Sequence, residues 1–319
     1  MKILITGGAG FIGSNFIHYW IDKYPEDKII NLDCLTYAAN LDNLVKHKNN
    51  SNYKFIKGDI CDEKLVQQIF RDEKLDLVIH FAAESHVDKS IKSSQKFIHT
   101  NVEGTRVLLD AALAHDKVRF HHISTDEVFG SLAPHDPPFN ESTPYNPRNP
   151  YSASKAASDF LVRSYFHTHN LPITISNCSN NYGPYQFLEK FIPLSITNLL
   201  KGNKIGVYGD GKNIRDWIHV SDHNRGVEAI IRRGKIGETY CLGGKGEISN
   251  LDLSYKILEI MNLGKENIEF IADRPGHDLR YAMDYAKAKR ELDWEPEIDF
   301  GEGLEQTIEW YRQNYLICE

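Results

Sequence analysis

The fold of this chain is decided by its opening stretch, Lys2-Ile3-Leu4-Ile5-Thr6-Gly7-Gly8-Ala9-Gly10-Phe11-Ile12-Gly13. The first five residues are mostly apolar and predict a short strand, and an apolar helical pattern follows the glycines. Glycines at every third position permit a tight turn and a close backbone approach at the start of that helix. The stretch therefore predicts a strand, a turn and a helix that hold the pyrophosphate of a dinucleotide.

A second apolar run, residues 28–32, ends in Asp33, about 20 residues beyond the last glycine. An acid at this place suits the ribose hydroxyls of an adenosine, and its alternative role is that of a turn residue. Residues 34–37 contain no Arg or Lys that would accept a 2′-phosphate. The pattern favours NAD over NADP.

Further apolar runs at residues 53–56 and 75–83 alternate with helical patterns, and one of these starts at Asn101. This alternation predicts an α/β fold with a Rossmann-like, doubly wound parallel sheet covered on both faces. Ligands of such sheets lie at the carboxyl ends of the strands. We therefore expect Asp59 and the stretch Ala82-Ala83-Glu84-Ser85 to lie near the cofactor.

The run 118–123 ends in Ser124-Thr125-Asp126-Glu127, where two carboxylates stand side by side. Adjacent like charges repel and cost free energy, and a protein keeps such a pair where a reaction uses it. This stretch is therefore a candidate reaction centre. The alternative is a helix N-cap, in which Thr125 or Asp126 accepts backbone N–H groups.

Tyr151 and Lys155 are four residues apart and share one face of a predicted helix, which Asn149 can cap and Pro150 can begin. A phenol with a pKa near ~10 needs about 4 kcal/mol of differential stabilisation to titrate near ~7. A neighbouring ammonium and a nicotinamide cation would supply it. Alone, such a pair is more often structural, but it follows a predicted dinucleotide fold here.

Composition excludes several classes of protein. The net charge of −7 disfavours nucleic acid as a partner, and no apolar run is long enough for a membrane span. Five cysteines without CxxC spacing argue against a disulfide framework, and the 14 histidines show no metal-binding spacing. We expect a cytoplasmic protein without a metal site.

The strict alternation weakens after about residue 175, which predicts a second, smaller part. We expect an NAD-binding domain at residues 1–176, with a returning segment near 213–242, and a smaller α/β substrate lobe at 177–319. The lobe carries Lys190, Arg215 and Arg274, cations that an anionic nucleoside diphosphate would need.

The glycines with Asp33, Asp59, Tyr151 and Lys155 resemble the extended short-chain dehydrogenase/reductase superfamily. Residues 82–88, 124–127 and 179–184 closely resemble the dTDP-glucose 4,6-dehydratase family within it, and the likeness runs essentially the full length. The resemblance implies a hydro-lyase with a tightly bound, recycled NAD. It would convert dTDP-glucose to dTDP-4-keto-6-deoxyglucose with loss of water.

The resemblance also implies site residues. The catalytic set is Thr125, Asp126, Glu127, Tyr151 and Lys155. The cofactor set is Gly7, Gly10, Phe11, Ile12, Gly13, Asp33, Thr36, Asp59, Ile60, Phe81, Ala82, Ala83, Ser85, Thr100, Tyr151, Lys155 and Asn181. The substrate set is Ser85, Thr125, Asn180, Lys190, Phe191, Tyr208, Arg215, Asn250, Asp273, Arg274 and His277.

Two positions depart from the family pattern, since Asn177 stands where arginine is frequent and Gly206 where proline is frequent. We expect both to lie close to the nucleotide site, which leaves the nucleotide base open. The alternatives are a nucleotide-sugar 4-epimerase, a dehydratase acting on another nucleotide hexose, and a silent NAD-binding regulator. Helices at residues 101–114 and 152–165 resemble the family's dimer bundle and imply a homodimer.

Overall fold

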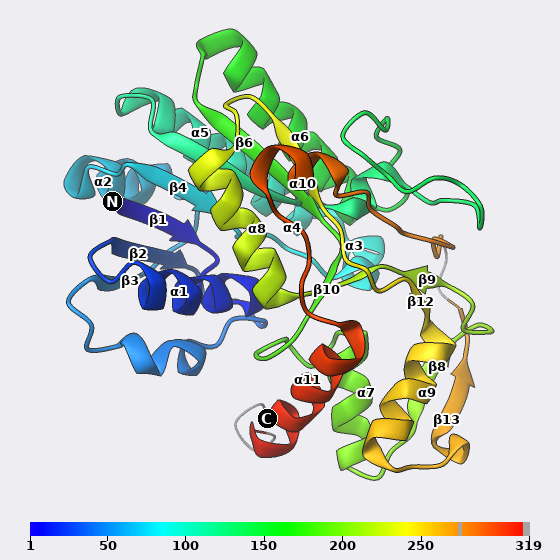
Figure 1. The fold of residues 1–319 in the computed structure, drawn as a ribbon. Helices are drawn as coiled ribbons and strands as arrows, with labels where there is room; N and C mark the ends of the chain where they lie inside the picture. The colour runs from blue at the N-terminus through cyan, green and yellow to red at the C-terminus, as the bar shows by residue number, and fades with distance from the viewer. Residues whose placement is uncertain (274–275, 315–319) are drawn as a thin grey trace.

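A seven-stranded sheet runs through the larger part of the chain in the computed structural model, which describes residues 1–273 and 276–314 (Figure 1). Every neighbouring pair of its strands is parallel. Their order across the sheet is β11-β6-β5-β4-β1-β2-β3. The strands are β1 (Lys2–Thr6), β2 (Lys28–Asp33), β3 (Tyr53–Lys57), β4 (Leu77–His80), β5 (Arg119–Thr125), β6 (Ile173–Cys178) and β11 (Thr239–Leu242). The predicted doubly wound parallel sheet is thereby confirmed.

Helices cover both faces of this sheet, and each face has its own apolar core (Figure 1). One face carries α1 (Phe11–Lys23), α8 (Val220–Arg233) and α10 (Ala286–Leu292). The other carries α2 (Glu63–Glu73), α5 (Thr105–Ala114) and α6 (Pro150–His169). Because both faces are buried, the strands are apolar nearly throughout, as their sequence indicated.

The strand order reverses at β1, whose neighbours are β2 on one side and β4 on the other. Connections leave in opposite directions at such a point and open a crevice at the carboxyl ends of the strands. The glycine turn after β1 and the Ser124–Glu127 stretch at the end of β5 both lie at this edge. The topology therefore brings together the two stretches that the sequence singled out.

A smaller part surrounds a third apolar core (Figure 1). It contains α7 (Phe191–Leu200), β8 (Ile205–Tyr208), β9 (Ile214–Arg215), β12 (Ile248–Ser249), α9 (Asn250–Met261), β13 (Ile268–Ile271) and α11 (Phe300–Asn314). The pair β7 (Asn180–Tyr182) and β10 (Trp217–His219) connects the parts. Since α8 and β11 return to the large sheet, the chain crosses between the parts more than once. The exact division at residue 176 stays a prediction.

Short helical elements complete the chain. They are η1 (Leu41–His47), α3 (Val87–Lys92), α4 (Gln95–Phe97), η2 (Ile98–Gly104), η3 (Asp126–Phe129) and η4 (Lys265–Asn267). The helix predicted from Asn101 is thus built from the π-helix η2 and from α5.

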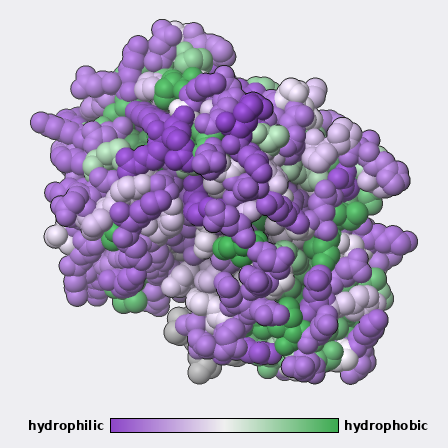
Figure 2. All heavy atoms as spheres, in the orientation of Figure 1, coloured by the Kyte–Doolittle hydropathy of each residue, from purple (hydrophilic) through white to green (hydrophobic). Residues whose placement is uncertain are grey.

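The visible surface is mostly hydrophilic, and its apolar groups gather chiefly over the smaller part (Figure 2). Over the described ranges, each helix is too short or too polar to cross a bilayer.

Candidate active site

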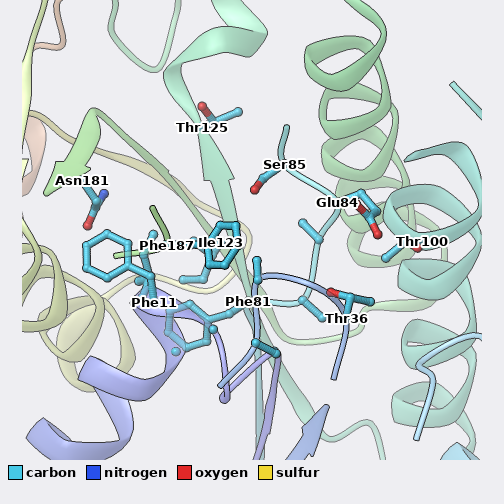
Figure 3. A pocket seen from close by; sticks show the side chains of 18 of the residues that line it. Phe11, Thr36, Phe81, Glu84, Ser85, Thr100, Ile123, Thr125, Asn181 and Phe187 are labelled. Carbon is cyan, nitrogen blue, oxygen red and sulfur yellow. The ribbon is translucent and has the colours of Figure 1, made fainter. Parts of the chain in front are cut away.

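A pocket lies at the carboxyl edge of the large sheet (Figure 3). The whole predicted cofactor set and the whole predicted catalytic set line it, together with Ser85, Asn180 and Lys190 of the substrate set. Lining residues outside these sets are Leu32, Cys34, Ala38, Ala39, Gly58, Glu84, Ile123, Ser124, Cys178, Ser179, Gln186, Phe187 and Glu189. The sheet therefore gathers residues from many parts of the sequence into one site. Their individual roles remain predictions.

The glycine turn fits a dinucleotide pyrophosphate. Gly7 has a φ of +71°, and a Cβ there would lie 2.6 Å from the backbone nitrogen of Ala82. A Cβ on Gly13 would lie 2.8 Å from the Cα of Gly8 and still closer to the carbonyl oxygen of Gly7. Gly10 precedes α1, and no side chain of the described residues caps that helix. The first N–H groups of α1 therefore remain available for an anion at the floor of the pocket.

Asp33 ends β2 beside this turn and is 7% exposed. Its carboxylate accepts hydrogen bonds from the backbone N–H of Ala9 (3.0 Å) and from that of Leu35 (2.8 Å). Burial raises the pKa of Asp33, and the two N–H groups oppose that shift. The carboxylate is thereby fixed in orientation with acceptor capacity left for ribose hydroxyls.

The Ser124–Glu127 stretch serves as both a cap and a part of the pocket. The Thr125 hydroxyl oxygen accepts from the backbone N–H of Glu127 (3.2 Å) and so caps η3. The same hydroxyl donates to Asp126 Oδ1 (3.1 Å). The N-cap alternative is thus confirmed at Thr125, and it does not exclude a reaction centre because the cap turns the acids into the pocket.

The two carboxyl groups have different surroundings. Asp126 is 2% exposed, and its Oδ2 has no hydrogen-bond partner among the described residues. Burial raises the pKa of Asp126 well above its usual range, and the charges of Glu127 and Asp216 add to the effect. Glu127 is half-buried, and its Oε2 accepts from Asn149 Nδ2 (3.3 Å). The structure therefore favours a protonated Asp126 beside a more accessible Glu127.

Helix α6 carries the other catalytic pair. Its side-chain cap is Asn149, which accepts from the backbone N–H of Ser152 (2.9 Å), and Pro150 is its first residue, as predicted. Tyr151 and Lys155 are 8% and 4% exposed. Lys155 Nζ donates to the carbonyl oxygen of Ile123 (2.8 Å), and burial lowers the pKa of Lys155 to about 8.

Tyr151 does not have a low pKa in the protein by itself. Burial raises the pKa of Tyr151 well above its ordinary value, and the charge of Glu127 adds to this, whereas a hydrogen bond with Thr125 opposes it. A phenolate at this position therefore needs more positive charge than the side chains alone supply. A nicotinamide cation would provide it.

The remaining predicted substrate residues lie outside this pocket, in the smaller part. They are Phe191, Tyr208, Arg215, Asn250, Asp273 and His277, and Arg274 lies outside the described residues. Phe191 packs against the core of the smaller part.

Arg215 acts electrostatically on the reaction centre. Its Nη2 donates to the carbonyl oxygen of Asp278 (3.0 Å), its guanidinium lies 4.2 Å from the ring centroid of Tyr281, and its charge lowers the pKa of Asp126. The charge of Arg215 therefore reaches the catalytic acid from the smaller part.

Asn177, which we expected close to the nucleotide site, is not among the residues that line the pocket. It is fully buried in β6, and its Nδ2 donates to the carbonyl oxygen of Thr125 (3.0 Å). Side chains alternate between the faces of a strand, so this residue packs behind the catalytic strand.

Sequence reasoning missed the segment before α7. Gln186, Phe187 and Glu189 line the pocket, and Glu189 accepts from the hydroxyl of Tyr37 (3.1 Å) and from Lys89 Nζ (3.2 Å). Phe187 projects toward the pocket from the side of Asn181 (Figure 3). The sequence contains one signal for this segment: Phe187 lies two residues before the charged pair Glu189-Lys190, directly ahead of a helix.

One trio could attract a metal ion. Ligand atoms of Asp59, Cys61 and His99 lie within 4.8 Å of one another. Burial and the nearby Asp59 raise the pKa of Cys61 to about 12. Exposed acidic groups are common without a bound ion, so this grouping alone does not establish a metal centre.

Comparison with known proteins places this site in a family. A family described as GDP-mannose 4,6 dehydratase matches residues 4–307. The dTDP-glucose 4,6-dehydratase of Mycobacterium tuberculosis is 49% identical over 98% of this chain and 94% of its own length.

Solved structures agree with this match. DesIV of Streptomyces venezuelae, a dTDP-glucose 4,6-dehydratase with NAD bound, has a TM-score of 0.96 and 44% identity, covering 99% of this chain and 98% of its own. The UDP-glucose 4-epimerase of Thermotoga maritima has a TM-score of 0.92 and 28% identity, covering 99% of this chain and 100% of its own. The chain therefore belongs to the dTDP-glucose 4,6-dehydratase family.

Proposed function

We propose that this chain is an NAD-dependent hydro-lyase that converts dTDP-glucose to dTDP-4-keto-6-deoxyglucose. The observation that carries the proposal is the pair Asp126 and Glu127 at the end of β5. One carboxyl is buried with a raised pKa, and the other is accessible in the same pocket as Tyr151. An acid and a base side by side suit an elimination, which must remove one proton and deliver another.

The glycine turn, Asp33 and the other predicted cofactor residues would hold the cofactor. NAD, when bound there, supplies a hydride acceptor for C4 of the sugar and a hydride donor for C6. Lys155 contributes a buried positive charge beside this region.

The side chains carry out four proton transfers. Tyr151 accepts the proton of the O4 hydroxyl while C4 is oxidised, and Thr125 hydrogen-bonds near O4. The C4 ketone acidifies the hydrogen on C5, which Glu127 removes as a base. Asp126 delivers its proton to O6, so that water leaves and a double bond forms between C5 and C6. Glu127, whose proton has exchanged with solvent, then returns a proton to C5 while C6 is reduced, which completes the 4-keto-6-deoxy sugar.

The nucleoside diphosphate of the substrate fits the lobe side of the site. Lys190 lines the pocket, and Arg215 lies at the lobe edge, so two cations are available to an anion that reaches from the catalytic acids into the lobe.

The direct test is turnover of dTDP-glucose set against UDP-, CDP- and GDP-glucose, with the product identified by mass and by ketosugar absorbance in alkali. We expect dTDP-glucose to be preferred and its product to be lighter by one water. If the protein prefers a different nucleotide base, its substrate is another nucleotide hexose. No turnover of any of them would reject the proposal.

The specific rival is a nucleotide-sugar 4-epimerase, because the fold is shared with one at a TM-score of 0.92. An epimerase inverts C4 and needs no acid–base pair for water loss, so Asp126 and Glu127 favour the dehydratase.

We also propose a homodimer in the cytoplasm. Two large apolar side chains on or beside the proposed helices, Ile98 and Phe160, are 55% and 56% exposed. The four described cysteines are unpaired, as in a reducing compartment. Sedimentation should give twice the chain mass of 36.5 kDa at micromolar concentration, and a monomer would contradict the dimer.

A further inference from the structure

A buried carboxylate lies behind the catalytic pocket and is not used by the proposed reaction. Asp159 follows Lys155 by one helical turn on α6 and is fully buried. Its Oδ2 accepts from Ser124 Oγ (2.8 Å) and from the Tyr145 hydroxyl (2.8 Å). A fully buried carboxylate needs compensation for its lost hydration, and neutral hydroxyls provide only part of it.

One positive charge beside this carboxylate, that of Lys155, is catalytic. His122 Nε2 lies 3.2 Å from Asp159 Oδ1 and 3.4 Å from Lys155 Nζ. Burial lowers the pKa of His122 to about 4, so this imidazole is neutral near pH 7. The Lys155 ammonium is then a cation facing Asp159, and its charge lowers the pKa of that carboxyl. Arg163 lies beyond the Tyr145 hydroxyl, to which its Nη2 donates (2.9 Å).

The charge of Lys155 depends in turn on its interaction with Asp159. From β4 and β5 it faces His80 and His122, both kept neutral by burial, and from β6 it faces Cys178, whose pKa burial raises to about 12. On its own helix it faces Asp159 and shares a face with Tyr151. Among these groups, Asp159 is the main one that opposes the loss of charge that burial imposes on Lys155.

We propose that Asp159 is a positioning residue, whose buried carboxylate keeps the Lys155 ammonium charged and held against β5 beside the cofactor pocket. Only the effect on turnover rests on the proposed function, since the charge of Lys155 can be measured without it. The competing explanation is that Asp159 merely ties α6 to β5 and to the segment that carries Tyr145.

Carbon-13 NMR of lysines labelled at Cε measures this charge directly. The Lys155 signal is the one that Lys155→Arg removes. We expect it to titrate at about 8 in the unaltered protein. In Asp159→Asn the titration should move down by about one pH unit or more, because an opposite charge at this range is worth that much. An unchanged titration would overturn the proposal.

Tyr145→Phe is the matched control. This variant removes one hydrogen bond to Asp159 and leaves the negative charge of Asp159 in place. The interaction of that charge with Lys155 is kept or strengthened, so the pKa of Lys155 should stay the same or rise. A fall in Tyr145→Phe would overturn the proposal, and this result decides the question even when Asp159→Asn does not fold.

Turnover of dTDP-glucose by the NAD-bound protein gives the functional readout. A one-unit shift lowers the rate of Asp159→Asn at pH 8 about fivefold relative to the unaltered protein and leaves it within about twofold at pH 6. Asp159→Glu should recover the rate at pH 8. An equal loss at every pH would contradict a role through Lys155. If the unaltered protein turns over no nucleotide hexose, the proposed function fails while the lysine titration still decides the role of Asp159.

Discussion

Replacing Asp126 by asparagine should make the protein more stable at neutral pH while it removes most of the activity. Asparagine has nearly the shape of aspartic acid and can still accept the Thr125 hydrogen bond at Oδ1. It carries no ionisable group, so it escapes the penalty that burial, Glu127 and Asp216 impose on a charged carboxylate at this place.

The sign follows from proton linkage. The pKa of Asp126 is raised in the folded protein, whereas it is about 3.9 in the unfolded chain. Between these two values the folded state binds more protons, so the free energy of unfolding falls as pH rises. One such proton gives a slope of about 1.4 kcal/mol per pH unit. Asp126→Asn lacks this term, so its advantage should grow with pH from about 4 up to the folded pKa and then stay constant.

The assay is urea unfolding of both proteins, each saturated with NAD, at pH 5, 6, 7 and 8. Turnover of dTDP-glucose should fall about 10²- to 10⁴-fold in Asp126→Asn, the range for loss of a general acid. A variant that is less stable than the unaltered protein by the same amount at every pH would refute the reasoning. That result would mean that Asp126 is charged and held by structural contacts.

Three further changes test other parts of the site. Glu127→Gln should lower dehydratase turnover about 10²- to 10⁴-fold and still allow C4 oxidation, seen as reduced nicotinamide absorbance in a single turnover, and full turnover would contradict the assignment of the base. Gly13→Ala should lower the NAD retained through gel filtration, because the added Cβ would collide with Gly7 and Gly8, and unchanged NAD content would contradict a tight turn at the pyrophosphate. Arg215→Met should raise the KM for dTDP-glucose about 10- to 100-fold through loss of a charged hydrogen bond, and an unchanged KM would exclude it from the substrate site.

The elements with local signals were predictable from the sequence. The glycine turn after β1 and the start of α6 at Asn149 and Pro150 follow from backbone conformation and capping, which a few neighbouring residues determine. The parallel sheet follows from apolar runs that must be buried on both faces. Asp33 was expected near the cofactor because it ends an apolar run about 20 residues beyond the last glycine, and it lines the pocket.

The rest depends on contacts between distant parts of the chain. Asp159 has the sequence context of a solvated helix acid, and its role emerges only because Ser124 and Tyr145 meet it from other elements. Asn177 was expected close to the nucleotide site, yet it is fully buried outside the pocket lining and donates to the carbonyl oxygen of Thr125, which no local pattern indicates.

Charge states were the least predictable part. The Tyr151–Lys155 spacing indicates a shared helix face, but the pKa values depend on burial and on residues from other elements, such as Glu127 near Tyr151. Burial raises the pKa of the phenol and lowers that of the amine, and neither direction can be read from a four-residue spacing.

The most direct test of the account is turnover of dTDP-glucose in deuterated water, followed by analysis of the product. Glu127 removes the C5 hydrogen, which solvent later replaces. We therefore predict a 4-keto-6-deoxy sugar that carries deuterium at C5 and no oxygen at C6. A product epimerised at C4 that keeps its oxygen at C6 and carries no deuterium at C5 would contradict the account.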